Sequence, residues 1–139
     1  MRRLASAALL SLMLTVPFGM TPASAANPSE QSLTSLPSGA LPISDYYNQS
    51  VYDSQDNKIG DVNDLLVDKD GKVSAVIVGV GGFLGAGEKN VAVPFTALKL
   101  SEKNGKRYLV MDTTKEALNN APGYTFDRNS YQWVPAKQG

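Results

Sequence analysis

One segment of the chain is apolar on both faces of an expected β-strand, and it constrains the fold more than any other feature. Between residues 72 and 80, alternate side chains fall into two sets: Val73, Ala75, Ile77 and Gly79, and Ser74, Val76, Val78 and Val80. Because successive side chains of a strand point to opposite faces, both faces are largely apolar. We therefore expect a central strand, covered by the core on one side and by a partner, a tail or a helix on the other.

Several shorter β-prone segments surround this strand, and turn signals separate them. The segments are residues 50–53, 59–67, 88–94, 99–101 and 106–111. Asp68-Lys69-Asp70-Gly71 predicts a turn in which Gly71 takes a positive φ, and Asn104-Gly105 is the strongest hairpin signal in the chain. Short strands with closely spaced turns are typical of a small antiparallel barrel.

The segment over residues 59–67 departs from strict alternation. A regular strand would place Asp61 and Asn63 on the same face as the apolar Ile59. One extra residue between Gly60 and Asn63 would move the later side chains to the opposite face. The pattern therefore predicts a β-bulge at this point of the strand.

The C-terminal part of the chain has a different pattern. Thr113 or Thr114 is a suitable N-cap for a short helix over residues 115–119, and Pro122-Gly123 ends that helix. Four aromatic residues follow as an aromatic tail: Tyr124, Phe126, Tyr131 and Trp133. The expected fold is thus mainly β, with one short C-terminal helix.

The first 25 residues carry an export signal. Arg2 and Arg3 precede a predominantly apolar run over residues 4–16, and Ala23-Ser24-Ala25 supplies the small residues for cleavage after Ala25. The run is shorter than the roughly 20 residues that a membrane span requires, so no stable span is expected after cleavage. Residues 1–25 are therefore predicted to be a signal peptide, and the mature protein to be periplasmic or secreted.

Residues 26–42 differ in composition from the rest of the mature chain. Ser, Pro and Gly are frequent there, and no apolar period runs through them. We predict a flexible leader over this stretch. Residues 43–139 are then the folded unit, a length that buries one modest core.

The composition excludes most catalytic chemistry. The chain has no cysteine and no histidine, which removes thiol nucleophiles, disulfides, Cys/His zinc sites and imidazole proton transfer. Removing residues 1–25 leaves eleven basic against thirteen acidic residues, a net charge of −2. The basic residues are scattered, with no excess to hold nucleic acid or an anionic membrane. We therefore expect a protein that is not an enzyme, needs no cofactor and binds no nucleic acid.

The order of the segments carries a family resemblance. A short strand, an acidic turn, an apolar strand, a glycine loop and a Val-Pro pair follow one another in residues 51–53, 59–68, 71–85 and 91–94. This succession resembles the PRC-barrel family over about residues 45–111. The resemblance implies a small six-stranded, antiparallel, partly open β-barrel that serves mainly as a docking module and has no shared catalytic site. Residues 43–139 are then a PRC-barrel-like domain with a C-terminal helix and an aromatic tail.

A glycine-rich segment, residues 81–87, follows the central strand. It matches neither the G-x-G-x-x-G nor the Gly-Lys-Ser/Thr phosphate-binding motif. Its centre holds Phe83 and Leu84 between Gly82 and Gly85, and exposure to water is unfavourable for two large apolar side chains. They either fold back onto the barrel or form a knob for a protein partner or for self-association. These four residues are the candidate partner-binding site.

Two other features support a ligand-binding alternative. Asp64, Asp68 and Asp70 are the candidate metal ligands, and the acidic turn resembles the start of a calcium loop. Counting Asp68 as the first position puts Gly79 at the twelfth, where such a loop requires a bidentate glutamate, so a solvated acidic turn is the simpler interpretation. The aromatic tail either closes the open side of the barrel or stacks on a ligand.

Together these observations predict an exported, non-enzymatic β-barrel docking module. Its partner is an unidentified protein or a second copy of the chain. Unpaired strand edges supply backbone hydrogen-bonding groups, and Phe83 and Leu84 supply apolar surface. The alternative is a small-ligand or divalent-cation binding protein that uses the acidic turn or the aromatic tail.

Overall fold

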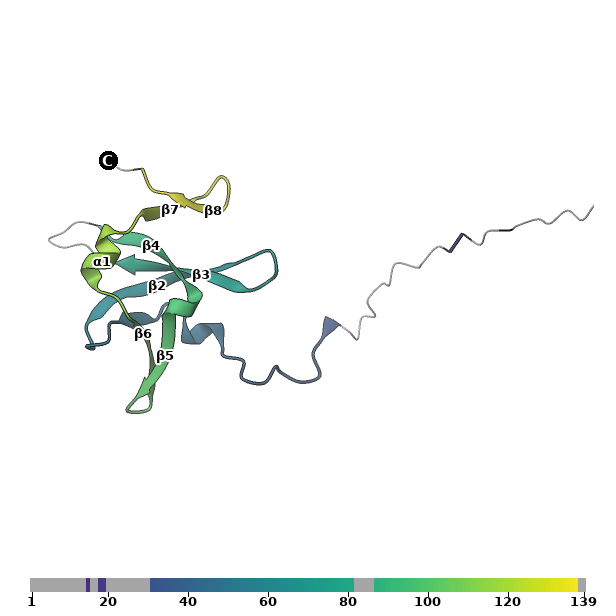
Figure 1. Ribbon diagram of the computed structural model, residues 1–139, viewed down its shortest axis with the longest axis horizontal. Helices are drawn as coiled ribbons and strands as arrows, with labels where there is room; N and C mark the ends of the chain where they lie inside the picture. Colours follow the sequence, from purple (N-terminus) through teal and green to yellow (C-terminus); the bar gives the residue numbers. More distant parts are fainter. Residues whose placement is uncertain (1–14, 16–17, 20–30, 82–86, 138–139) are drawn as a thin grey trace, which may run out of the picture. The chain divides into compact units, whose positions relative to one another are not determined.

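The computed structural model describes residues 15, 18–19, 31–81 and 87–137 (Figure 1). The chain divides into two units, Met1–Ser38 and Gly39–Gly139. The described residues of the first unit are all exposed, and none of them belongs to a strand. The second unit contains every strand and helix given below.

Four consecutive strands form the centre of the sheet: β1 (Ser50–Tyr52), β2 (Lys58–Val67), β3 (Val73–Val80) and β4 (Lys89–Pro94). Each pairs antiparallel with the next one along the chain. Gly71, in the turn between β2 and β3, has a φ of 81°, as its turn signal predicts. The two-sided apolar segment is thus the third of four strands and has a neighbour on each side.

The predicted bulge in β2 is present. Val62 lies opposite Val78 of β3, whereas Asp64 lies opposite Ile77, so the register shifts and Asn63 is the extra residue. Val62 is fully buried in the core. Asp64 and Ile77 share a face because they are cross-strand partners.

A second hairpin continues the sheet beyond β1. The 3-10 turn η3 (Phe95–Ala97) leads into β5 (Leu98–Lys103), which pairs antiparallel with β6 (Lys106–Met111). Asn104 and Gly105 have φ values of 54° and 75°, as the two-residue Asn-Gly turn requires. β6 then pairs with β1 in parallel, contrary to the all-antiparallel expectation. That expectation rested on hairpins between successive strands, whereas β1 and β6 are far apart in the sequence.

The C-terminal part begins with the predicted short helix, α1 (Lys115–Asn120). Thr114 is its N-cap, and its Oγ1 accepts a hydrogen bond of 3.1 Å from the backbone N of Ala117. The chain continues into β7 (Gly123–Asp127) and β8 (Gln132–Pro135), which pair with each other. We call β7, β8 and their turn the C-terminal hairpin. In the described ranges, no helix is long and apolar enough to cross a membrane.

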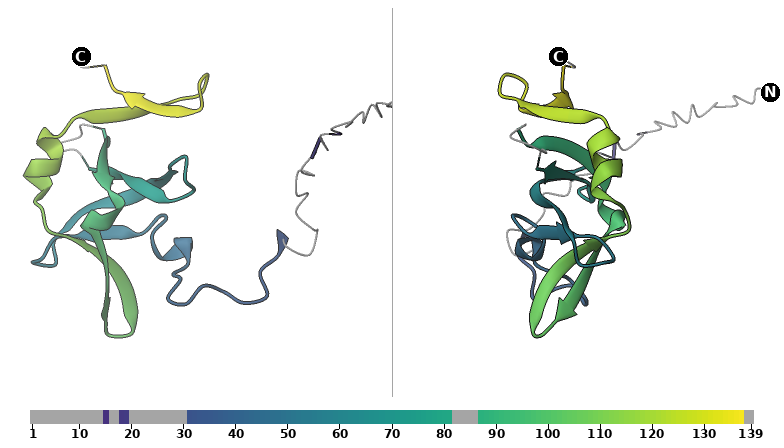
Figure 2. Two further views of the ribbon diagram at one scale, coloured as in Figure 1. Left: turned by 45° about the vertical axis from the view of Figure 1, so that its right-hand side comes forward. Right: turned by 90° about the vertical axis from the view of Figure 1, so that its left-hand side faces the viewer.

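In the described residues, eight strands form one sheet in the order β5-β6-β1-β2-β3-β4-β7-β8. Figure 2 shows the C-terminal hairpin, coloured from yellow-green to yellow, at the top of the domain in both views. The sheet does not close, since β5 and β8 stand at the two ends of this order. A mainly β, partly open architecture is therefore confirmed, but the strand count is eight instead of six, and two strands follow the helix. Both extra strands come from the aromatic tail. They were missed because their turn places Tyr131, and not Gly or Asn, at a positive φ of 55°.

The core lies on one face of the sheet. Thirteen buried side chains form it: Tyr46, Val51, Ile59, Val62, Val76, Val78, Val80, Val91, Val93, Leu98, Leu109, Met111 and Leu118. Leu118 comes from α1, and Tyr46 from the turn that precedes β1. Burial of this aliphatic surface, at about 25 cal/mol per Å², is the main stabilising contribution to the fold.

The opposite face of the central strands, which we call the second face, is covered separately. Ile77 is fully buried there although it is not a member of the core cluster. Its cross-strand partner Asp64 accepts a hydrogen bond of 2.8 Å at Oδ2 from Nε1 of Trp133 in β8. The C-terminal hairpin therefore supplies a cover for the second apolar face of β3.

A polar cluster occupies the second face at Gly79. Nδ2 of Asn63 donates to Glu88 Oε1 at 3.1 Å and to Asn90 Oδ1 at 2.8 Å. A Cβ at Gly79 would lie 1.6 Å from Glu88 Oε1 and 2.5 Å from Asn63 Nδ2. A larger residue at this position therefore requires the ends of the Glu88 and Asn63 side chains to move.

Candidate binding groove

The β5–β6 hairpin brings basic side chains together at its tip. Lys103 lies directly opposite Lys106 in the register, and Arg107 follows on β6. Like charges in directly opposite positions of two strands repel each other. Asp56, in the turn between β1 and β2, offsets part of this repulsion because its Oδ2 accepts a hydrogen bond of 2.8 Å from Lys103 Nζ. That hydrogen bond raises the pKa of Lys103 above its ordinary value.

The three cations of the tip differ in their partners. Lys103 is paired with Asp56, and Arg107 forms an ion pair with Asp45 of η2 (Ile43–Asp45). Within residues 31–81 and 87–137, Lys106 has no acidic partner. Lys106 is therefore the cation that is left to interact with a bound anion.

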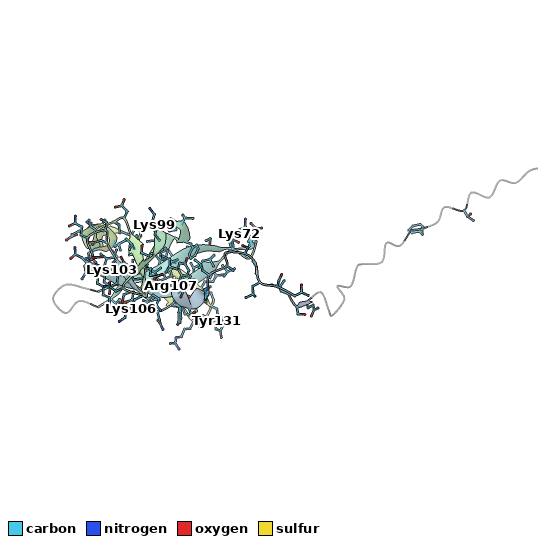
Figure 3. All side chains as sticks on the ribbon, turned by 90° about the horizontal axis from the view of Figure 1, so that it is seen from below. Lys72, Lys99, Lys103, Lys106, Arg107 and Tyr131 are labelled. Atoms are coloured by element: carbon cyan, nitrogen blue, oxygen red, sulfur yellow. The ribbon has the colours of Figure 1, made fainter. Side chains whose placement is uncertain are left out.

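The tip forms one wall of an open groove of about 550 Å³. Nine residues line it: Gln49, Ser50, Tyr52, Asp56, Lys103, Asn104, Lys106, Arg107 and Tyr108. Figure 3 shows Lys103, Lys106 and Arg107 from below, with Lys72 toward the other end of the domain in that view. Three basic residues and one acidic residue leave the lining with an excess of positive charge.

Two tyrosine rings form the apolar part of this groove. Tyr52 and Tyr108 are half-buried, and their ring centroids lie 5.9 Å apart in an edge-to-face arrangement. The parallel pairing of β1 with β6 places them side by side. Such a pair contributes about 0.5–1.5 kcal/mol beyond its buried area and gives the groove a firm floor. Ammonium, guanidinium and hydroxyl groups beside aromatic surface suit a ligand that carries carboxylates.

The four partner-binding residues suggested by the sequence cannot be compared with the groove. Gly82, Phe83, Leu84 and Gly85 are outside the described residues. A docking knob at these residues therefore stays a prediction.

The three candidate metal ligands do not form one site in the described structure. Asp64 Oδ2 accepts the hydrogen bond from Trp133, and Asp68 Oδ1 accepts from the backbone N of Asp70 at 2.9 Å and of Lys72 at 3.1 Å. In the part of the chain that the structure describes, no three acidic side chains come together as metal ligands. Asp64 thus anchors the C-terminal hairpin, and Asp68 closes the turn between β2 and β3.

The aromatic tail packs back onto the sheet. The rings of Phe126 and Trp133 lie 5.6 Å apart on neighbouring strands of the C-terminal hairpin, edge to face. Tyr124 pairs with Asn90 at the edge of β4. Tyr131 is 80% exposed in the turn between β7 and β8. Stacking of these rings on a ligand stays a hypothesis.

Sequence reasoning missed the groove because it treated the basic residues as scattered. One local signal was present: Lys103 and Lys106 flank the Asn-Gly turn, so a two-residue hairpin makes them cross-strand neighbours. The apolar part of the groove, the Tyr52–Tyr108 pair, had no such signal. Tyr52 comes next to Tyr108 only through the parallel β1–β6 pair, which joins distant parts of the sequence.

Comparison with known proteins adds one finding about the domain. The family model of the PRC-barrel domain matches residues 39–118. No curated protein matches the chain. The matched range contains all core and groove residues and ends within α1.

Proposed function

The chain belongs to the PRC-barrel domain family, and from this premise we propose that it is an exported, non-enzymatic docking module that holds a carboxylate-bearing segment of another protein in its basic groove. The signal sequence in residues 1–25 supports export to the periplasm or the medium. The lack of cysteine and histidine in the sequence supports binding without catalysis.

The observation that carries the proposal is the unequal pairing of the groove cations. Asp56 and Asp45 hold Lys103 and Arg107 in place, whereas Lys106 lies beside the Tyr52–Tyr108 pair without an acidic partner among the described residues. A carboxylate that enters the groove meets the ammonium group of Lys106, which has no acidic partner among the described residues, and the paired Lys103 ammonium and Arg107 guanidinium groups that also line it. Because the remaining protein surface is mildly acidic overall, charge complementarity directs an anionic segment to this groove.

The size of the groove favours a protein segment over a small ion. A volume of about 550 Å³ lies in the range of sites for organic ligands and exceeds what one small anion fills. Asn104 adds an amide group that suits the backbone of a peptide. Gln49 Nε2 and Ser50 Oγ also line the groove, but they already donate to Ser44 O at 3.1 Å and to Asp61 Oδ1 at 2.9 Å. An exposed ion pair contributes only about 0.2–1 kcal/mol, so the complex is expected to be weak and reversible.

Fluorescence anisotropy with a labelled oligoglutamate peptide tests the groove directly. The mature chain is expected to bind this peptide at low salt, and Lys106→Glu to weaken binding about tenfold, since it replaces an attraction of about 1 kcal/mol by a repulsion. Asp56→Asn is expected to strengthen binding because it frees Lys103. Lys72→Glu, at an exposed position outside the groove, is the matched control and should change affinity little.

Two results would count against the groove. One is equal weakening by Lys106→Glu and Lys72→Glu, which would mean that only net charge matters. The other is tighter or unchanged binding after Lys106→Glu. The double variant Phe83→Ser/Leu84→Ser separates the two docking hypotheses, because it should leave oligoglutamate binding unchanged if the groove is the site.

A further inference from the structure

The C-terminal hairpin is a self-contained unit. Its strands are joined by four register pairs, from Tyr124 opposite Pro135 to Asp127 opposite Gln132. Asp127 closes the turn by accepting hydrogen bonds from the backbone N of Asn129 at 3.0 Å and from Oγ of Ser130 at 2.8 Å. The hairpin therefore keeps its internal contacts wherever it is placed.

Its attachment to the rest of the sheet is small. The ladder between β4 and β7 consists of two pairs, Asn90 opposite Tyr124 and Val91 opposite Gly123. The hydrogen bond from Trp133 to Asp64 adds one anchor on the second face. We call the edge of β4 at residues 90–91 together with Asp64 the seat of the hairpin.

The core does not depend on this hairpin. Every member of the core cluster lies between Tyr46 and Leu118, and the family match ends at residue 118. The seat nevertheless needs an occupant, because β4 would otherwise present an unpaired edge and Ile77 would lose cover on the second face. A separable hairpin on an otherwise complete domain is the arrangement that allows exchange between copies.

We propose that this seat is an interaction surface for the C-terminal hairpin of a second copy, so that two chains form a dimer by exchanging their hairpins. The second copy carries the same Trp133 and the same β7 edge, and exchange replaces each contact by an identical one. The two forms differ by the entropy of association and by the conformation of the connection at residues 121–122, where Ala121 packs against the core and its backbone N donates to Leu118 O at 3.1 Å. The balance between them therefore depends on protein concentration. This inference is independent of the basic groove.

The lack of cysteine in the natural chain permits a sharp test with the full mature protein. Asn90 and Tyr124 are cross-strand partners, so cysteines at these positions fall within the Cα separation that a disulfide spans. One copy carries Asn90→Cys and a second, of different tag size, carries Tyr124→Cys. The two are unfolded together, refolded at high concentration and oxidised. Hairpin exchange is expected to give a disulfide-linked heterodimer on a non-reducing gel.

Two controls make every outcome informative. Asn90→Cys mixed with Lys99→Cys on β5 should give no heterodimer above background, since Lys99 does not face the seat. The chain that carries both Asn90→Cys and Tyr124→Cys, refolded at low concentration, should form the disulfide within one chain. If this intrachain bond forms and the mixed pair gives no heterodimer, the proposal is overturned. Failure of the intrachain bond in a chain with native circular dichroism also overturns it, because the seat would then be wrong.

Discussion

The core strands and the C-terminal hairpin belong to the same sheet but are held in different ways. β3 and β4 share six register pairs and bury aliphatic side chains completely. The hairpin joins β4 through two pairs and the second face through one hydrogen bond, and its Phe126 is 42% exposed. Stability is therefore concentrated in the family-matched segment. The hairpin covers the second face and is attached to it by a few, mainly polar contacts.

The largest effect is expected in the core. Leu109 is fully buried on β6. The substitution Leu109→Ala should lower the free energy of unfolding by about 2–5 kcal/mol, because the lost methyl groups leave a cavity. Phe126→Ala in the C-terminal hairpin should cost about 1 kcal/mol or less, the contribution of its contact with Trp133. Urea denaturation followed by circular dichroism measures both. Equal losses would show that the hairpin is as much a part of the core as β6.

An intermediate effect is expected at Gly79, which lies between the two regions. Gly79→Ala puts a methyl group where the carboxylate of Glu88 and the amide of Asn63 now lie. Because these atoms are the ends of flexible side chains and Glu88 is exposed, moving them should cost about 1 kcal/mol, the low end of the cost of overpacking. Gly81→Ala is the matched control, since its Cβ would meet no atom of the described residues within 4 Å and its φ is not positive.

Differential scanning calorimetry of the two glycine variants gives the comparison. Gly79→Ala should lower the melting temperature, whereas Gly81→Ala should leave it nearly unchanged. The amide resonance of Asn63 should shift in the first variant only. A stable Gly79→Ala protein with unshifted resonances would mean that the polar cluster is not needed on the second face.

The parts of the fold that were predictable from the sequence depend on neighbouring residues. The Gly71 and Asn104-Gly105 turns, the bulge near Asn63 and the Thr114 cap each leave a signal within a few positions. The central position of β3 was predictable because a strand with two apolar faces needs two covers. What covers the second face was left open between a partner, a tail and a helix. The answer depends on the hydrogen bond from Trp133 to Asp64, which joins residues 69 positions apart.

The candidate groove was less predictable than the fold, for the same physical reason. Lys103, Lys106 and Arg107 are close in sequence, but their value as a site depends on Asp45 and Asp56, which hold two of them from distant turns. No local pattern reports which cation is left unpaired. That Lys106 has no acidic partner in the described part of the chain follows only from the three-dimensional arrangement of ion pairs.

The smallest effect concerns two aspartates that close corresponding turns in the two regions. Asp53 accepts a hydrogen bond of 2.9 Å from the backbone N of Asn57, and Asp127 accepts one of 3.0 Å from that of Asn129. These bonds lower the pKa of both carboxyls below the ordinary value of 3.8. A carboxyl with a lowered folded-state pKa contributes stability that is fully present above 3.8 and is lost as the pH falls through that lowered pKa.

Carboxyl-carbon NMR should therefore give titration midpoints below 3.8 for both residues. Asp53→Asn and Asp127→Asn each remove one midpoint while keeping an oxygen acceptor for the turn, so they assign the signals. Protonation of Asp53 should leave the β1–β2 turn in place, because that turn joins two strands of the core. Protonation of Asp127 should loosen the C-terminal hairpin, because few contacts hold the hairpin on the sheet. Trp133, the single tryptophan of the chain, should therefore change its fluorescence over the Asp127 midpoint, and this change should be absent in Asp127→Asn. Fluorescence that follows the Asp53 midpoint instead would show that the hairpin is released only when the core opens.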